Sequence, residues 1–457
     1  MSTAHAQCQF AWSSGYERQG GPLDAYWQSI VFDDGNGEAL YVCTNGGRVY
    51  KYNGSAWQKI GHAYGNTSGV ASGICYAMTI ADPDGPGPLG RQLFVSGWFR
   101  RMASPSQSST NASTAHGVAR WDGTSWYNEG TPQMQATTLQ GLTTFDDGGG
   151  EKVYLGGNFE IGIGRKIAVR DFNGQWSLVG EEVPSFQSGD EVNVLHAFDD
   201  GSGAALYVGG LFQGVGGVTS PGVVKWNGTA WVGLGAGVQY HTGEGGRVYG
   251  LTHFDDGSGP KLIASGNIHS SGGDTSVRGV AKWNGSQWTG MGADYTLGRV
   301  GPFVGVFDTG TGPHLYAFGP LGNMDAKGVA RWNGTDWESP NWDANVLGQP
   351  LTINAFDVDG PSPLPTRLIA CTNQVMQQDG TTWIPLPSYP ASNALSGVIQ
   401  LTALDADGPG PGAPALYATG DFLTSTNGQP VLKLGTFDGT AWSPAYGGLP
   451  NLEIKYG

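Results

Sequence analysis

The chain alternates short apolar runs with turns rich in Gly, Asp and Asn. The pattern is clearest over 193–235, NVLHAFDDGSGAALYVGGLFQGVGGVTSPGVVKWNGTAWVGLG. This stretch predicts four strands, because runs of this length with many β-branched and aromatic residues, bounded by Gly or Asn-Gly turns, are typical of strands. The same text recurs from about residue 26 to about residue 448. A four-stranded unit that repeats in this way predicts a β-propeller.

One tryptophan closes each repeat and therefore counts the repeats. These residues are Trp57, Trp126, Trp176, Trp231, Trp288, Trp337, Trp383 and Trp442. We predict an all-β protein with a single β-propeller of eight four-stranded blades over 26–457. The count becomes seven if the repeat around Trp383, whose third strand is nearly absent from the pattern, is not a full blade. Residues 1–25 are expected to be an N-terminal segment that holds a signal-peptide remnant and a ring-closing strand, Phe10-Ala11-Trp12-Ser13.

The third strand of a repeat carries Lys or Arg immediately before an aromatic residue. Examples are Lys51, Arg120, Lys225, Lys282 and Arg331. Because side chains alternate along a strand, we expect the ring to pack between blades and the cation to lie outside, beside the Asp residues of the turns. The closing tryptophans are expected to be structural, with a cost of about 3–5 kcal/mol for Trp231→Ala.

The two ends of the strands differ in how strictly their connections repeat. The first-to-second and third-to-fourth turns share one face and are nearly verbatim copies, whereas the other connections share the opposite face and vary. Variable loops on a rigid frame are where binding residues usually lie. The longest loop, 98–116, begins with an off-pattern tryptophan beside two arginines, which could bind a sugar or an acid; the alternative is a loop that packs over its neighbour. The ligand-binding candidates on this face are Trp98, Arg100, Arg101, His269, Asp274, Asn323 and Asp325.

Amide and carboxylate residues suggest a cation near the variable face. In five repeats Asn or Asp follows the second-strand Gly position, at Asn45, Asn158, Asn267, Asn373 and Asp421, and the inner strands add Asn193, Asn354 and Gln400. Calcium takes oxygen ligands, including amide carbonyls, so Ca²⁺ is a candidate cofactor. The alternative is that Asn is chosen for a left-handed backbone after Gly. The catalytic candidates are His196, Glu191 and Asp190, although a lone histidine is more often a hydrogen-bonded structural group.

Composition narrows the classes of function and partner. The net charge of −15 argues against a nucleic-acid partner, which requires a positive face. The chain has no apolar run of 18 residues, so the sequence predicts no membrane span. Cys43 and Cys371 occupy the same repeat position, where a small buried residue is expected, and pairing of Cys8 or Cys75 with one of them is left open. Ala4-His5-Ala6 matches the pattern before a signal-peptidase cut, which favours a secreted, processed protein.

The order of strand, LYVxGG, strand and closing Trp resembles the kelch family of propellers. The chain also resembles poorly characterised secreted bacterial proteins built from FDDGxGxxLYVGGxF…WNGxxW repeats. The resemblance covers nearly the whole chain and implies the architecture, but propellers host binders and enzymes alike.

Three functions follow as hypotheses. The first is a secreted, monomeric binding module that recognises a small molecule or glycan, with carbohydrate favoured, on the variable face. The second is a Ca²⁺-dependent hydrolase or lyase with its site at the mouth of the central channel. The third is a structural or surface protein.

Overall fold

The computed structural model describes most of the repeat region and part of each remaining segment. The described residues are 28–36, 38–43, 47–52, 57–65, 73–104, 107, 111–134, 138–161, 164–180, 190–240, 246–292, 303–309, 311–318, 328–338, 352–356, 367–371, 375–379, 382–385, 398–404, 415–426, 429–437 and 442–444. Several predicted residues lie outside this set: the strand at 10–13, Asn45, Asn323, Asp325 and Asn373. The backbones of Asn354, Gln400 and Asp421 are described, but their side chains are not.

The first four antiparallel sheets follow the predicted repeats, and we number the sheets in chain order. Sheet 1 contains β1 (Gln28–Asp33), β2 (Glu38–Cys43), β3 (Arg48–Tyr52), β4 (Trp57–Tyr64), β7 (Arg101–Ala103) and β8 (Ser113–Thr114). Sheet 2 contains β5 (Ile74–Ala81), β6 (Gln92–Trp98), β9 (Val118–Trp121) and β10 (Trp126–Asn128). Sheet 3 contains β11 (Gly141–Asp146), β12 (Glu151–Ile161), β13 (Gly164–Arg170) and β14 (Trp176–Leu178). Sheet 4 contains β15 (Glu191–Asp199), β16 (Ala204–Leu211), β19 (Val223–Trp226) and β20 (Trp231–Gly233).

The other four large sheets have four strands each. Sheet 5 contains β21 (Arg247–Asp255), β22 (Pro260–Asn267), β23 (Val280–Trp283) and β24 (Trp288–Gly290). Sheet 6 contains β25 (Phe303–Asp308), β26 (Pro313–Phe318), β27 (Val329–Trp332) and β28 (Trp337–Glu338). Sheet 7 contains β29 (Thr352–Phe356), β30 (Arg367–Cys371), β31 (Val375–Asp379) and β32 (Thr382–Pro385). Sheet 8 contains β33 (Val398–Leu404), β34 (Ala415–Thr426), β35 (Gln429–Phe437) and β36 (Trp442–Pro444).

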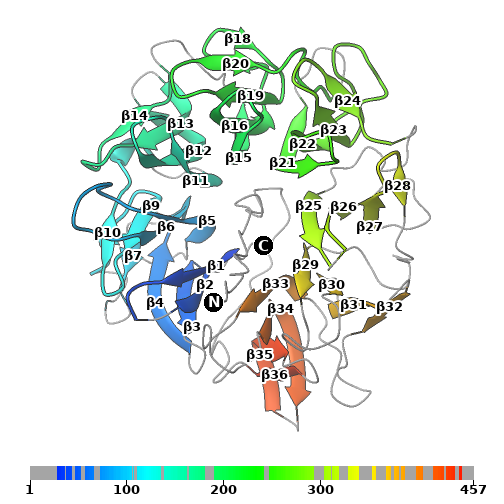
Figure 1. The fold of residues 1–457 in the computed structure, drawn as a ribbon. Helices are drawn as coiled ribbons and strands as arrows, with labels where there is room; N and C mark the ends of the chain where they lie inside the picture. Colours follow the sequence, from blue (N-terminus) through cyan, green and yellow to red (C-terminus); the bar gives the residue numbers. More distant parts are fainter. Residues whose placement is uncertain are drawn as a thin grey trace, which may run out of the picture.

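The sheets stand around a ring, with the first strand of each sheet nearest the centre (Figure 1). Neighbouring innermost strands touch in the order β1, β5, β11, β15, β21, β25, β29 and β33, and β33 touches β1. The described residues also contain a short hairpin of β17 (Gly214–Val215) and β18 (Val218–Thr219). Their only helical segment is one 3-10 turn, Pro132–Met134. The all-β propeller class is therefore confirmed. The count of eight blades stays a prediction, because residues 1–27 and several connections lie outside the described set.

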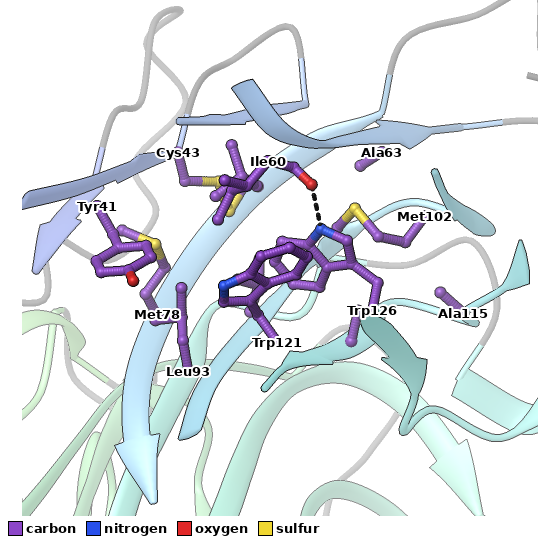
Figure 2. Packing of buried hydrophobic residues seen from close by; sticks show 14 of the residues in the cluster. Tyr41, Cys43, Ile60, Ala63, Met78, Leu93, Met102, Ala115, Trp121 and Trp126 are labelled. Carbon is purple, nitrogen blue, oxygen red and sulfur yellow. Dashed lines mark hydrogen bonds between the residues drawn. A yellow bond between two sulfur atoms is a disulfide. The ribbon is translucent and has the colours of Figure 1, made fainter. Parts of the chain in front are cut away.

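In sheets 2 to 6 the closing tryptophan joins the sheet to the one before it. The indole Nε1 donates to a main-chain oxygen of the preceding repeat in five pairs: Trp126 to Ile60 at 2.6 Å, Trp176 to Glu129 at 2.5 Å, Trp231 to Val179 at 3.2 Å, Trp288 to Leu234 at 3.0 Å and Trp337 to Met291 at 2.7 Å. Figure 2 shows Trp126 packed beside Trp121 and bonded to Ile60, within a core formed by sheets 1 and 2. These contacts confirm the structural role expected for the closing residues.

The repeated turns share one edge of the ring, which we call the turn face; the opposite edge is the loop face. In three of the four FDDG turns the second Asp accepts from the third-strand lysine, as expected: Lys51–Asp34 at 2.6 Å, Lys225–Asp200 at 3.0 Å and Lys282–Asp256 at 2.8 Å. In the fourth turn, Asp147 accepts instead from Lys152 of the second strand, at 2.7 Å. A second-strand tyrosine donates its hydroxyl to the same carboxylate in three sheets: Tyr41 to Asp34 at 2.6 Å, Tyr154 to Asp147 at 3.1 Å and Tyr207 to Asp200 at 2.7 Å. The turn face is thus a set of near-identical polar clusters.

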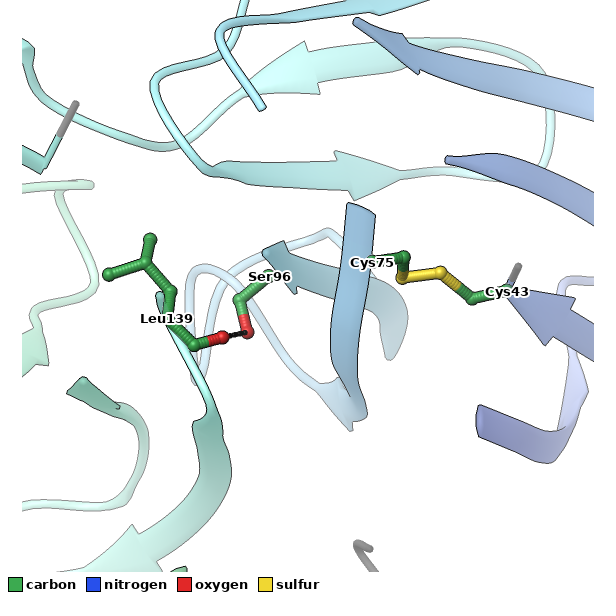
Figure 3. The surroundings of a disulfide bond; sticks show 4 residues. All are labelled: Cys43, Cys75, Ser96 and Leu139. Atoms are coloured by element: carbon green, nitrogen blue, oxygen red, sulfur yellow. Dashed lines mark hydrogen bonds between the residues drawn. A yellow bond between two sulfur atoms is a disulfide. The ribbon is translucent and has the colours of Figure 1, made fainter. Parts of the chain in front are cut away.

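Two additional links tie sheet 1 to sheet 2. A disulfide joins Cys43 on β2 to Cys75 on β5, with Cα atoms 5.9 Å apart and both residues buried (Figure 3). It is one of the pairings that the sequence left open. Residues from the loop 98–116 also form the β7–β8 hairpin, which pairs with β4 and extends sheet 1. The loop therefore packs over its neighbour, which was the alternative interpretation of that segment.

The innermost strands contain β-bulges that the repeat pattern did not predict. In β15 the pairing shifts between Val192 and Val194, so Asn193 is the extra residue. Equivalent shifts leave Tyr76 in β5, Tyr249 in β21 and Ile399 in β33 as the extra residue. A bulge redirects a side chain, so these positions depart from simple alternation near the loop face.

Candidate functional site

A group of aromatic and basic side chains lies on the loop face where sheets 1 and 2 meet. We call it the basic corner; its members are Arg48, His62, Tyr64, Trp98, Arg100, Arg101 and His116, all half-buried. The β4–β7 ladder sets Tyr64 opposite Arg101, and the Arg100 N–H donates to the Tyr64 carbonyl oxygen at 2.8 Å. The hairpin therefore brings two arginines beside the end of β4.

Close backbone packing positions the rings of the basic corner. The His62 and Tyr64 ring centroids are 4.2 Å apart. A Cβ atom at Gly65 would come within 2.3 Å of the Trp98 ring, so only glycine allows the indole to lie there. Burial raises the pKa of Tyr64, and the nearby Arg48 guanidinium acts in the opposite direction. The result is three partly exposed rings beside fixed cations.

His116 has the one positive φ angle among the described non-glycine residues, 44°. Its N–H donates to the Arg100 carbonyl oxygen at 3.3 Å, and its buried Nδ1 has no hydrogen-bond partner. Burial, and secondarily the Arg100 charge, lowers the pKa of His116. A strained backbone and an unsatisfied nitrogen at the end of a loop are features that cluster at ligand sites.

The chemistry of the basic corner suits an anionic or polyhydroxylated ligand. It contains three arginines and two histidines, in a chain whose net charge is −15. Guanidinium groups can donate two parallel hydrogen bonds to a carboxylate, and aromatic faces can stack on an apolar ring face.

Five other predicted residues lie in a second region, the loop-face end of the junction between sheets 4 and 5. Glu191 forms an ion pair with Arg247 at 3.1 Å, and the Asn193 Nδ2 donates to the Val248 carbonyl oxygen at 3.1 Å. Asn267 lies opposite Arg247 in the ladder. The remaining members are His269, whose ring is 4.6 Å from that of Tyr240, and Asp274, whose exposed carboxylate caps Ser276. Sheets 2, 3 and 4 separate this group from the basic corner, so the predicted ligand residues do not form one cluster.

His196 lies deeper in the same junction and contacts another histidine. Its Nε2 is 3.2 Å from the His253 Nδ1, its side chain is 1% exposed, and its Nδ1 has no partner. Burial, and secondarily His253, lowers the pKa of His196 to about 3. The ring is therefore neutral at ordinary pH and enclosed by protein. A catalytic role for His196, Glu191 or Asp190 stays a prediction.

The amides proposed to hold calcium come from different sheets. Asn193 is buried with its amide nitrogen bonded to sheet 5, whereas Asn158 at the loop end of sheet 3 is exposed. Among the described residues, no three or more His, Cys, Asp or Glu side chains gather in a group that could hold a metal ion. The described candidates Asn158, Asn193 and Asn267 belong to three different sheets, so we derive no step from calcium, which stays a prediction.

The sequence pattern missed four members of the basic corner: Arg48, His62, Tyr64 and His116. A signal was present, because β4 has eight residues while the equivalent β10 has three. An outer strand that continues well past its closing tryptophan indicates an additional pairing partner.

The comparisons with known proteins concern architecture. No protein-family model and no curated protein matches the chain. A structure of YCF48 bound to a D1 peptide is similar at a TM-score of 0.38 and 12% identity, covering 79% of this chain and 91% of that one. BBS1N in complex with ARL6DN scores 0.37 at 12% identity, covering 87% and 94%. An exo-inulinase from Aspergillus awamori scores 0.26 at 11% identity, covering 93% and 91%. Similarity at this level concerns the fold alone.

Within the described residues, no helix has the length and apolar character needed to cross a membrane.

Proposed function

We propose that this chain is a secreted, kelch-like β-propeller binding module whose basic corner recognises a carbohydrate that carries a carboxylate. The observation behind the proposal is the gathering of Tyr64, Trp98 and Arg100 by the β7–β8 hairpin on the loop face. Arginine supplies paired donors for a carboxylate, and a half-exposed indole supplies a stacking surface for a sugar ring.

Two further features support parts of this proposal. The Cys43–Cys75 disulfide suits an oxidising compartment outside the cytosol, which supports secretion. The LYVxGG repeat with its closing tryptophan supports the kelch-like assignment. The partial exposure of the corner's side chains suits a monosaccharide unit at the end or side of a glycan.

Titration calorimetry with glucuronate, galacturonate and sialic acid, beside their neutral counterparts, tests the ligand class. We expect binding of at least one acidic sugar, lost by tenfold or more in Arg100→Ala, because a charge-assisted hydrogen bond contributes about 1.5–3 kcal/mol. His116→Gly should weaken binding while leaving the fold intact, because glycine accepts a positive φ without strain.

Arg91→Ala is the matched control. Arg91 is an exposed arginine on the turn face that pairs with Glu151 at 2.9 Å, so its loss should leave sugar binding unchanged. Equal binding of neutral and acidic sugars would contradict the proposal that the corner recognises a carboxylate. Absence of binding to every sugar in the panel would contradict the proposal that its ligand is a carbohydrate.

A further inference from the structure

A hollow opens on the turn face between sheets 5 and 6, far from the loop face that carries the basic corner. Its volume is about 390 Å³, and its walls include Phe254, Asp256, His314, Arg331, Trp332 and Glu338. We call it the turn-face hollow. The repeat offers an internal comparison, because the junction of sheets 3 and 4 shows which group can fill the equivalent place.

At the junction of sheets 3 and 4 a tyrosine hydroxyl bridges the two sheets. The Tyr154 hydroxyl donates to Asp147 of its own sheet at 3.1 Å, and the side chain of Trp226 in sheet 4 hydrogen-bonds to the same tyrosine. Tyr154 is 1% exposed, so its hydroxyl is enclosed. One phenol therefore satisfies a carboxylate on one side and an indole N–H on the other.

Sheet 5 has isoleucine at the position that tyrosine holds in sheet 4. Tyr207 pairs with Lys225 in the β16–β19 ladder, and Ile263 pairs with Lys282 in the equivalent β22–β23 ladder. Isoleucine has no hydroxyl, so no phenol from this strand reaches the Asp256 carboxylate.

The indole of the next sheet is also unsatisfied at this junction. Trp332 is 7% exposed, and its Nε1 has no hydrogen-bond partner. An unsatisfied buried donor costs about 1–3 kcal/mol, so the site gains if a ligand supplies an acceptor. Trp121 also has an unpartnered Nε1, but it packs in one cluster with Tyr41. The distinguishing feature of the hollow is therefore the absent phenol together with the open volume.

Sheet 6 departs from the repeat in a second way. Thr309 replaces the second Asp of the turn, and Arg331 pairs instead with Glu338 of β28. The Arg331 and Glu338 side chains are 40% and 39% exposed. His314, another wall residue, has its Nε2 3.1 Å from the Thr311 hydroxyl oxygen. The rim is thus polar, while Phe254 and the Trp332 ring supply the apolar wall.

We propose that the turn-face hollow binds a phenol, with the ligand hydroxyl between the Asp256 carboxylate and the Trp332 Nε1. The hydroxyl donates to the carboxylate and accepts from the indole N–H, as the Tyr154 hydroxyl does between sheets 3 and 4. The aromatic ring lies against Phe254. The phenol comes from a small aromatic molecule or from the tyrosine side chain of a peptide. This site is independent of the carbohydrate proposed for the loop face.

Binding of p-cresol to the full chain, followed by ligand-observed NMR, tests the proposal. We expect a Kd of about 1 mM for a ligand of this size, and about tenfold or weaker binding of toluene, which lacks the hydroxyl. Asp256→Asn should weaken p-cresol binding about tenfold, because the acceptor loses its charge. Trp332→Phe keeps a ring and removes the N–H, and should weaken binding in the same direction. N-acetyltyrosinamide binding more tightly than p-cresol would identify a peptide as the source.

Ile263→Tyr is the decisive variant, because it places the hydroxyl within the chain and should abolish p-cresol binding. A folded Ile263→Tyr protein that retains p-cresol binding overturns the proposal. Equal binding of toluene and p-cresol overturns it too, as does binding of methyl glucoside in place of p-cresol. If Ile263→Tyr does not fold, the other two variants decide. Unchanged p-cresol binding in both Asp256→Asn and Trp332→Phe then overturns the proposal.

Discussion

The junction between sheets 3 and 4 and the junction between sheets 5 and 6 have the same backbone plan and differ in a few side chains. In the first, Tyr154 links Asp147 to Trp226 and closes the gap. In the second, Ile263 replaces the tyrosine and Trp332 keeps an unpartnered N–H beside a hollow of about 390 Å³. In a repeat protein, one repeat can therefore serve as the control for another. A residue that departs from the repeat is informative where a neighbouring repeat shows which contact the usual residue makes.

The largest expected effect comes from a closing tryptophan, which bonds to the preceding sheet at both of these junctions and at three others. Trp288 is 3% exposed and donates to the Leu234 carbonyl oxygen at 3.0 Å. Trp288→Ala should reduce the free energy of unfolding by about 3–5 kcal/mol, because it leaves a large cavity between sheets. Chemical denaturation measures the change. Trp231→Ala is the comparison. Trp231 is only half-buried, so we now expect a smaller loss than the value of about 3–5 kcal/mol predicted from the sequence. A loss as large as that of Trp288→Ala would contradict the role of burial.

The disulfide makes the junction of sheets 1 and 2 different from those between sheets 3 and 6. Cys43 and Cys75 are 32 residues apart in the sequence. Closing a loop of this length restricts the unfolded chain and contributes about 3–4 kcal/mol in the chain-entropy account. Unfolding of a Cys43→Ala, Cys75→Ala double variant should therefore need markedly less denaturant. Addition of a reductant should shift the parent toward the variant and leave the variant unchanged; a shift of both would point to another target.

A smaller loss of stability is expected from a variant that makes the junction of sheets 3 and 4 resemble the junction of sheets 5 and 6. Tyr154→Phe removes the hydroxyl and leaves Asp147 and Trp226 without it, at a cost of about 1–3 kcal/mol. Thermal unfolding measures the cost. The variant also sharpens the comparison, because it should not bind p-cresol: the phenylalanine ring still occupies the position that Ile263 holds in sheet 5. Binding of p-cresol by Tyr154→Phe would show that loss of the hydroxyl alone makes the site.

The smallest effect at neutral pH is expected at the histidine pair between sheets 4 and 5. The folded-state pKa of His196 is about 3, below the ordinary value of 6.5, mainly because the ring is buried. The folded state therefore binds fewer protons than the unfolded chain, so the stabilisation is present above about pH 6.5 and is lost as pH falls toward 3.

Thr143 and Thr252 stand opposite the second strand at the same register in sheets 3 and 5, which makes His196→Thr the natural variant. Melting temperatures between pH 7 and pH 4 should fall less steeply in His196→Thr than in the parent. Parallel curves for the two proteins would assign the acid sensitivity to other groups.

The repeat carried most of the information needed for the fold. Strand order, turn positions and the pairing of Lys225 with Asp200 follow from local period and turn chemistry, which act within one sheet. The bulge at Asn193 and the pairing of β7 with β4 did not follow, because each depends on a partner strand that alternation does not specify.

The candidate sites divide in the same way. Trp98 and Arg100 stood out as departures from the repeat, whereas Arg48 and Tyr64 join them only through pairing with β7 and its neighbours. Ile263 was visible in the sequence as KLIASG where other repeats read LYVGG, but its meaning required the hydrogen bonds of Tyr154.

The β7–β8 hairpin and the disulfide both cross from sheet 2 to sheet 1. When a closed ring of sheets unfolds, one junction between neighbouring sheets must separate first. Two sheets joined by a covalent bond and a shared ladder will separate last. Sheets 1 and 2 should therefore open as one cooperative unit. Hydrogen exchange would show this as equal protection of the backbone amides of β4 and β6. Amides of the strands on either side of the turn-face hollow should exchange sooner, because we expect the ring to open there first.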